Sequence, residues 1–351
     1  MILALELLGI ILVLVVLHEV GHFATAKYFG VKVHEFGVGF PPKLLGFRRG
    51  ETEYTLNLIP LGGFVKLAGE NDPSEPQSLA SKPPIVRIIV LSAGSFMNAL
   101  LAVAIFAALF MIPRDVAMGD VYIEEVSTNS PAQEAGLLPM DRILTVDGHR
   151  IENINDLASR INRSLGNEIA LTAERDGMTI DVKLVPRWRP PKDQGPTGIL
   201  LRIENASVER RSDPFWKAVP KATAQIGVVV SLTSTALSQW VTGDAPFPGT
   251  GPVGIVHGTQ EVVEAGGILA LIPLTALLSI SLAIFNILPI PALDGGRLLF
   301  VIIEWVRRGK RIPPEKEGLV HMIGFAVLIA MVLVISYNDV LRIIRGESFI
   351  R

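Results

Sequence analysis

Long apolar stretches separated by polar segments run along the chain, and they predict helices that cross a membrane. Three of these stretches carry few or no charges and cover residues 88–112, 268–291 and 319–337. A fourth covers residues 1–17 and continues to Ala26. Roughly 20 helical residues cross a hydrocarbon core of about 30 Å. The pattern therefore predicts a polytopic α-helical membrane protein with about four transmembrane helices.

The composition supports this class and excludes other kinds of chemistry. Hydrophobic residues make up 49% of the chain, 19% of residues are charged, and the mean hydropathy is +0.44. A typical soluble chain is less apolar. The absence of cysteine excludes a disulfide framework and thiolate catalysis. A net charge of −2, without a basic patch interleaved with aromatic residues, gives no indication of nucleic-acid binding.

The first apolar stretch has a second interpretation as a secretory signal, because residues 24–26 read Ala-Thr-Ala and resemble a cleavage site. No Lys or Arg precedes the stretch, however, and a disposable signal has no need of polar side chains. This stretch contains Glu6, His18, Glu19 and His22. We therefore interpret it as a membrane-spanning helix.

Basic loops indicate how the chain is oriented. Residues 27–87 and the segment that follows the third span both contain many lysines and arginines, which include Lys32, Lys43, Arg48, Arg49, Lys66, Lys82 and Arg87 in the first and Arg297, Arg307, Arg308, Lys310, Arg311 and Lys316 in the second. Short loops of this kind remain cytoplasmic. The N-terminus is then extracytoplasmic, and so is the region after Ile112.

That region, residues 114–206, is expected to be a small α/β domain. Charges of both signs are interspersed, and short apolar runs alternate with turn signals. Residues 156–161 suit a short helix, and residues 169–173 with 179–185 suit a hairpin. The stretches Pro-Ala-Gln-Glu-Ala-Gly-Leu at 131–137, Asp-Arg-Ile-Leu and Val-Asp-Gly follow one another in an order that resembles the signature of PDZ domains.

The most specific chemical signal is the pattern His18-Glu19-Val20-Gly21-His22 inside the first apolar stretch. Histidines at i and i+4 lie on one face of a helix about 6 Å apart, so both rings can bind one Zn²⁺ ion. Glu19 lies one step around the helix, from where it can act as general base on a water molecule. Polar groups inside an apolar span are costly and are usually functional.

A catalytic zinc ion usually has three protein ligands, so a third ligand is expected. Asp294 has the best context, because it follows a segment in which Pro289, Pro291 and the glycines at 295 and 296 must interrupt a helix. A broken helix at membrane depth is tolerated where it lines protein or a wet cavity. The other candidates are isolated polar residues near segment ends or in loops, namely His257, Glu304, Asp339 and His321.

Residues 222–241 are uncharged but rich in Thr, Ser and Gln. An extra crossing there would place His18 and Asp294 at opposite faces of the membrane, so we interpret the segment as an interfacial or re-entrant helix region. The expected division of the chain is a membrane core of residues 1–113, a PDZ-like domain of residues 114–206, an interfacial linker of residues 207–266 and a second membrane core of residues 267–351.

These motifs together resemble the site-2 protease family, and specifically its bacterial branch with a single PDZ domain. The resemblance rests on the His-Glu-x-x-His pattern, the sequence from Asn286 to Gly295 that reads N-x-x-P-x-P-x-L-D-G, a PDZ-like insert and a G-x-x-x-N element at residues 94–98. It implies a multi-pass protein of the bacterial plasma membrane. Its expected ligands for Zn²⁺ are His18, His22 and Asp294, with Glu19 as catalytic base.

The resemblance also implies cleavage of single-span membrane proteins, such as anti-sigma factors or signal-peptide remnants. Residues 53–58 and 64–67 read as a hairpin that turns at 60–63 on the cytoplasmic side, and its edge is expected either to receive the substrate as an added strand or merely to cover the site. The expected substrate-binding residues are Gly63, Asn286, Pro289 and Pro291, although Asn286 is also a good helix cap. Residues 198–200 resemble the strand beside the carboxylate-binding loop of PDZ domains and suggest a peptide C-terminus as ligand. A PDZ fold that only excludes substrates with bulky ectodomains explains the same residues.

Three other functions are weaker interpretations of the same sequence. A membrane-anchored protease that cuts soluble loops does not need His18 buried in an apolar run. A membrane scaffold that only binds partners through its PDZ domain does not need Glu19, since a structural zinc site has four protein ligands. A transporter is disfavoured because the two halves show no repeated pair of broken helices.

Overall fold

The computed structural model describes residues 2–70, 74–188, 190–191, 194–243 and 249–349. The chain divides into two compact units by its internal contacts. One unit combines Met1–Leu109 with Ala218–Arg351, and the other is Phe110–Lys217. The first unit therefore joins both ends of the sequence, with the second unit inserted between them.

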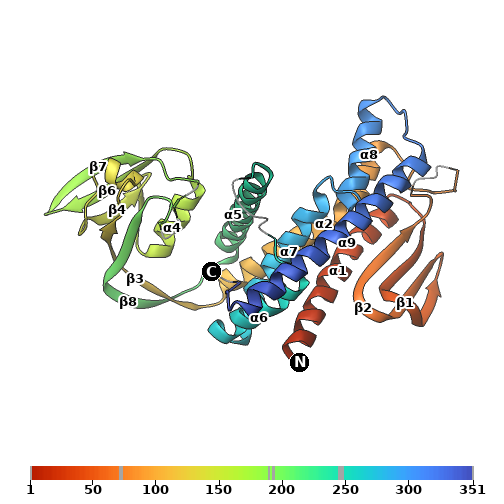
Figure 1. Cartoon of the computed structure of the whole chain (residues 1–351), viewed down its shortest axis with the longest axis horizontal. Coiled ribbons are helices and arrows are strands. Elements are labelled where there is room, and N and C mark those ends of the chain that lie inside the picture. The colour runs from red at the N-terminus through yellow and green to blue at the C-terminus, as the bar shows by residue number, and fades with distance from the viewer. Residues whose placement is uncertain (1, 71–73, 189, 192–193, 244–248, 350–351) are drawn as a thin grey trace. The chain divides into compact units, whose positions relative to one another are not determined.

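Four helices of the described chain are long and apolar enough to cross a membrane, as the sequence predicts. They are α1 (Ile2–Tyr28), α2 (Pro84–Met111), the helix α7 (Leu271–Ile287) with its preceding 3₁₀ turn Ile268–Ala270, and α9 (Pro314–Ile344) (Figure 1). The third span ends at Ile287 instead of the expected residue 291, because Pro289 and Pro291 follow. In α9, none of the most apolar window is buried inside the protein, as is expected of a helix that faces lipid.

Three further helices complete the first unit. They are α5 (Phe215–Val241), α6 (Pro252–Gly266) and α8 (Asp294–Val306). Helix α5 contains the predicted interfacial segment and is not among the four candidate spans. Asp339 of α9 accepts a hydrogen bond of 2.9 Å from the backbone N–H of Gly254, which lies in the first turn of α6. A carboxylate at this position satisfies one of the free donors of a helix N-terminus and joins α6 to α9.

The predicted hairpin within residues 53–67 is wrong in its pairing. Both segments belong to one strand, β2 (Thr52–Leu67), which pairs with β1 (Val33–Arg49). The chain reverses at Gly50, whose φ of +62° suits a turn, and not at residues 60–63. Residues 35–38 of β1 pair with residues 53–56 and also with residues 63–66. Both parts of β2 thus find hydrogen-bond partners on β1, so they do not pair with each other.

The second unit contains one mixed helix and sheet domain. Its strands are β3 (Arg114–Val126), β4 (Arg142–Val146), β5 (His149–Arg150), β6 (Ile169–Arg175), β7 (Met178–Leu184) and β8 (Ile199–Arg211). The order β7-β6-β4-β3-β8 makes β8 an edge strand. The predicted hairpin is confirmed as β6 and β7, and the predicted short helix lies within α4 (Ile154–Arg163), while α3 is Pro131–Glu134. Val121, Ile143 and Leu157 belong to its buried core.

The boundaries of this unit differ from the expected 114–206. Strands β3 and β8 pair from Arg114 with Arg211 to Val126 with Ile199, so the pairing continues past residue 206. The compact unit extends accordingly to Lys217. Residues 207–211 read Ser-Val-Glu-Arg-Arg, and a single apolar residue gave too weak a signal for this strand extension.

In the first unit, a buried apolar cluster joins the elements that carry the polar centre. Ala26 of α1, Leu67 of β2, Val90 of α2 and Val301 of α8 belong to it. Helix α1 also approaches α2 closely at Gly21. A Cβ atom built on Gly21 would lie 2.4 Å from the carbonyl oxygen of Ala93. A small residue at a helix contact is what close packing of membrane helices requires.

We expect Gly21→Ala to lower the melting temperature of the detergent-solubilised protein. The added methyl group meets a backbone carbonyl, which cannot rotate away, and such overpacking costs about 1–3 kcal/mol. The control is Gly9→Ala on the same helix, where a Cβ would meet no atom within 4 Å. This control should be neutral or slightly stabilising, since Ala is the better helix former. Equal melting temperatures for both variants would contradict the close contact.

Candidate metal centre

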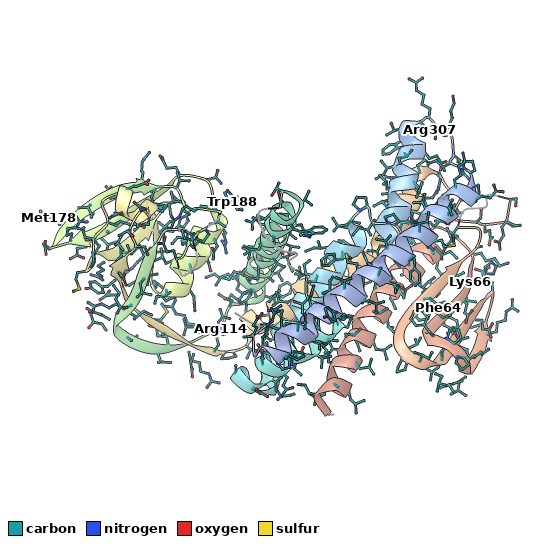
Figure 2. The ribbon with its side chains drawn as sticks, viewed as in Figure 1. Phe64, Lys66, Arg114, Met178, Trp188 and Arg307 are labelled. Atoms are coloured by element: carbon teal, nitrogen blue, oxygen red, sulfur yellow. The ribbon has the colours of Figure 1, made fainter. Side chains whose placement is uncertain are left out.

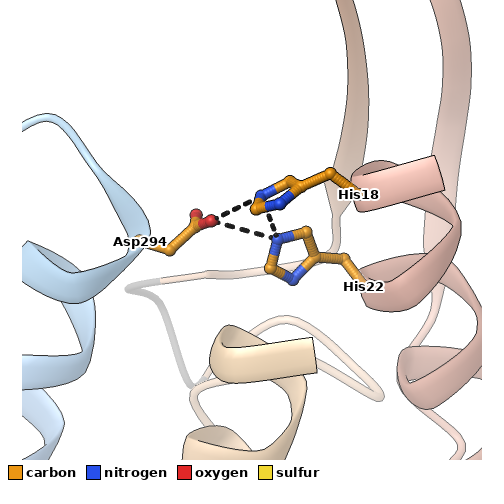
Figure 3. Close-up of side chains that lie close together, drawn as sticks. All are labelled: His18, His22 and Asp294. Atoms are coloured by element: carbon orange, nitrogen blue, oxygen red, sulfur yellow. Dashed lines mark hydrogen bonds and ion pairs between the residues drawn. The ribbon is translucent and has the colours of Figure 1, made fainter. Parts of the chain in front are cut away.

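Three side chains converge on one point in the first unit (Figure 3). His18 and His22 project from α1, and Asp294 projects from the first turn of α8. Nε2 of His18 lies 2.9 Å, and Nε2 of His22 lies 3.1 Å, from Oδ2 of Asp294, while the two Nε2 atoms are 3.2 Å apart. Two donors bound to a tetrahedral zinc ion at about 2.1 Å lie about 3.4 Å apart. The observed spacing is slightly shorter than this value.

The hydrogen bond behind His22 fixes the direction of its lone pair. Nδ1 of His22 lies 2.7 Å from the carbonyl oxygen of Val90, which can only accept a hydrogen bond. Nδ1 therefore carries a proton, and whenever the ring is neutral the lone pair of Nε2 points at the carboxylate of Asp294. Two acceptors at 3.1 Å repel each other unless a proton or a cation lies between them. The donor set thus fits a metal ion, and a backbone carbonyl behind a histidine is the usual arrangement at metal sites.

Asn98 of α2 occupies the corresponding position behind His18. Its amide nitrogen lies 3.4 Å from Nδ1 of His18, and its Oδ1 is buried without a hydrogen-bond partner among the described residues. The two amide atoms are exchangeable by a rotation of the side chain. With Oδ1 turned to His18, the amide would accept the Nδ1 proton that a ligand bound through Nε2 must carry. Asn98 belongs to the G-x-x-x-N element of the sequence.

Asp294 reaches the histidines because the chain between α7 and α8 is a tight non-helical segment. Leu288 adopts extended dihedral angles at the end of α7, and Asp294 is the first residue of α8. A Cβ on Gly295 would lie 2.0 Å from the carbonyl oxygen of Leu288, and one on Gly296 would lie 2.5 Å from that of Ile290. The two glycines therefore allow the start of α8 to pack against the backbone that precedes it.

Glu19 lies beside β2. The backbone N–H of Val65 donates a hydrogen bond to its carboxylate, and a Cβ on Gly63 would lie 3.3 Å from its Cγ. Figure 2 marks the neighbouring Phe64 and Lys66 on the same strand. The residue expected to act as base is thus positioned by the strand that the sequence associates with the substrate.

Comparisons with known proteins identify the family. The model of peptidase family M50 matches residues 6–331. The chain belongs to peptidase family M50. A Clostridium perfringens chain provisionally named a zinc metalloprotease is 36% identical over 93% of this chain and 95% of its own length. The "Regulator of sigma-W protease RasP" of Bacillus subtilis is 30% identical over 94% of this chain and 96% of its own.

A solved PDZ domain of an SdrC-like protein from Listeria monocytogenes matches 24% of this M50 chain and 90% of its own length, at 20% identity and a TM-score of 0.21. The resemblance of the sequence to site-2 proteases is confirmed by the family match. The M50 chain is accordingly a zinc-dependent intramembrane metalloprotease.

The other acidic and histidine candidates have partners elsewhere. Glu304 pairs with Arg87 at 2.5 Å and with Arg311 at 2.9 Å. Burial raises the pKa of Glu304, but these hydrogen bonds outweigh it and hold the pKa below its usual range. His257 lies 3.6 Å from Glu261 on α6. Asp339 bonds to α6, as described above, and His321 accepts a hydrogen bond from the backbone of the segment before Asp294. Among the described residues, only His18, His22 and Asp294 form a group of three potential ligands.

The expected substrate-binding residues surround the same segment. Asn286 is half-buried in the last turn of α7, and Pro289 and Pro291 lie between α7 and α8. The residues at the two helix caps are Leu288 and Leu293, so Asn286 occupies neither cap position. The substrate-binding roles of these residues and of Gly63 stay predictions. Sequence reasoning missed the positions of Val65 and Val90, because backbone groups leave no signal in residue types.

We expect Gly94→Ala to reduce zinc affinity by roughly 10-fold or more, as losses around metal ligands do. A Cβ on Gly94 would lie 2.4 Å from Nε2 of His22 and 2.6 Å from Nε2 of His18. Zinc content after dialysis against a chelator measures the effect. Ser92→Ala on the same helix is the control, since that hydroxyl bonds to its own helix at Ile88. Wild-type zinc retention by folded Gly94→Ala protein would contradict the assigned centre.

Proposed function

We propose that His18, His22 and Asp294 hold the catalytic zinc ion and that Glu19 is the general base for cleavage of single-span membrane proteins. The observation that carries the proposal is the convergence of three donors from α1 and α8, inside a unit whose helices are long and apolar enough to cross a membrane. A metal centre on such a helix is within reach of peptide bonds in or next to the bilayer. The name of the Bacillus subtilis relative supports regulatory substrates such as anti-sigma factors, with signal-peptide remnants as the second class.

In this mechanism the protein groups bind, orient and move protons. A bound zinc ion supplies polarisation of the scissile carbonyl and makes water a stronger acid. His22 is held in one tautomer by Val90, and the carboxylate of Asp294 balances part of the metal charge. Glu19 accepts the proton of the attacking water and delivers it to the leaving amine. The N–H of Val65 holds the Glu19 carboxylate in the orientation in which Glu19 can accept this proton.

The substrate has to leave its helical conformation, because a helix hides its peptide bonds in its own hydrogen bonds. Residues 63–67 of β2 pair with β1 on one side, and the N–H of Val65 points from the other side to Glu19. Alternate residues of a strand point their N–H groups the same way. Gly63 therefore offers a further donor along the edge that faces the base, and an extended substrate added there would present its carbonyl beside Glu19.

Asn286, Pro289 and Pro291 complete the proposed substrate site from the other side of the centre. The backbone from Leu288 to Leu293 is not helical, so it has groups that can bond to an extended peptide. We assign β1, β2 and the metal centre to the cytoplasmic side of the bacterial plasma membrane, because basic loops flank them. The N-terminus and the PDZ-like unit are then extracytoplasmic.

The PDZ-like unit is proposed to dock a peptide C-terminus. Strand β8 begins at Ile199 and is an edge strand, with β3 as its neighbour. Gly198 precedes it with φ of +75°, and a Cβ there would lie 2.3 Å from Cβ of Ser130. This compact turn beside an open strand edge supports recognition of an extended peptide by strand addition. A scaffold that binds without cleavage would not account for Glu19 beside the three donors.

We expect Glu19→Gln to abolish cleavage of a tagged single-span substrate in liposomes while zinc content remains at the wild-type level. The amide keeps the size of the side chain but cannot accept the proton, and general-base loss costs about 10²–10⁴-fold in rate. Glu6→Gln on the same helix is the matched control and should cleave normally. Unchanged cleavage by Glu19→Gln would reject Glu19 as the base, and loss of zinc from it would reject its assignment as a non-ligand.

We expect Gly63→Pro to reduce kcat/KM on the same substrate much more than Gly63→Ala. Both changes add a carbon beside Glu19, but only proline removes the outward N–H that the substrate strand would use. Zinc content should stay the same in both variants. Equal kinetic effects would indicate that Gly63 matters only for space, and the proposed strand addition would lose its support.

A further inference from the structure

The last transmembrane helix touches the segment that carries Asp294. Nδ1 of His321, on α9, accepts a hydrogen bond of 2.9 Å from the backbone N–H of Ala292. Ala292 lies two residues before Asp294 and has a φ of +78°. A residue with a side chain seldom adopts this left-handed conformation, which persists only where its surroundings enforce it. The bond to His321 is one contact that enforces it.

Gly324 of α9 provides the second contact. It lies three residues after His321, so both residues face the same side of the helix. A Cβ on Gly324 would lie 2.2 Å from Cβ of Pro291 and 3.1 Å from its Cα. The ring of Pro291 therefore occupies the space that a side chain at position 324 would fill. Together, His321 and Gly324 bind the two consecutive residues Pro291 and Ala292.

The imidazole of His321 is itself held in place. The ring of Phe300, on α8, lies 5.6 Å from it between centroids. Nδ1 accepts a hydrogen bond, so the proton of the neutral ring is on Nε2, which is buried without a hydrogen-bond partner among the described residues. Oε1 of Glu317, one turn earlier on α9, is 4.0 Å from Nε2. A buried polar atom without a partner costs stability. In a purely structural role, His321 would bring no benefit that offsets this cost.

We propose that His321 is a positioning residue for the proposed metal ligand Asp294, and that Gly324 leaves the space in which Pro291 packs against α9. The pair fixes Pro291 and Ala292, and through them sets where α8 begins and where the carboxylate of Asp294 points. The inference rests on the proposed role of Asp294 as a zinc ligand. It assigns a positioning role to α9, which contributes none of the three candidate ligands.

The test measures zinc affinity by chelator competition, the visible spectrum of the cobalt-substituted protein, and kcat and KM on a single-span substrate. The variants are His321→Ala, His321→Asn and Gly324→Ala, and the control is His257→Ala on α6. Asn retains an acceptor at the position of Nδ1, so His321→Asn should restore the hydrogen bond to Ala292 that His321→Ala removes. Melting temperatures of all variants identify any that fail to fold.

We expect His321→Ala to weaken zinc binding and reduce kcat by roughly 10–100-fold, the range found when support of a ligand is removed. KM should stay close to the wild-type value, and the cobalt spectrum should change. His321→Asn should recover most of the loss, and Gly324→Ala should reproduce the loss by displacing Pro291. His257→Ala should match the wild type in every measurement.

Wild-type zinc affinity, spectrum and kcat in folded His321→Ala would overturn the positioning role and leave the proposed function intact. An equal loss in His321→Ala and His321→Asn would also overturn it, because the acceptor would then be irrelevant. Zinc binding and cleavage at wild-type levels in the Asp294→Ala variant would overturn the proposed centre itself, and the inference with it.

Discussion

The meeting of two histidine nitrogens and a carboxylate oxygen about 3 Å apart is the constraint on which the first unit depends. Lone pairs and a negative charge at this distance, away from water, are unfavourable unless a cation compensates them. The two histidines come from α1 and the carboxylate comes from α8, far along the chain, so no local preference can assemble the three donors. The packing of α1, α2 and α8 has to supply the energy that brings them together, and the buried cluster around Val90 and Val301 provides apolar contacts for it.

Backbone atoms position the side chains around the centre, and glycines leave the space for this close approach. Gly21 lets the backbone of α2 approach α1, and Gly94 leaves room for both imidazoles. Gly295 lets α8 begin against the carbonyl of Leu288. The carbonyl of Val90 and the N–H of Val65 then hold His22 and Glu19. In an apolar medium such bonds lack competition from water, so few of them suffice to orient the reacting groups.

The same segments that hold the proposed catalytic residues also carry the residues proposed to bind the substrate. The strand edge that is proposed to unwind the substrate is the same strand that orients the proposed base, since Val65 contacts Glu19 and Gly63 lies beside it. On the other side, the broken segment between α7 and α8 carries both Asp294 and the residues expected to contact substrate.

The sequence by itself determined the membrane class, four candidate spanning helices and the candidate ligand pair His18 and His22, because apolar length and i, i+4 spacing are local properties. The prolines and glycines around Asp294 also predicted the interruption of the helix before it. It could not determine the pairing of β2, since Pro60 and Gly63 look like turn residues whether or not β1 offers partners to both halves of the strand. Nor could it reveal Val65, Val90 and His321. Their roles depend on which backbone groups lie next to which side chains, and only the tertiary structure decides that.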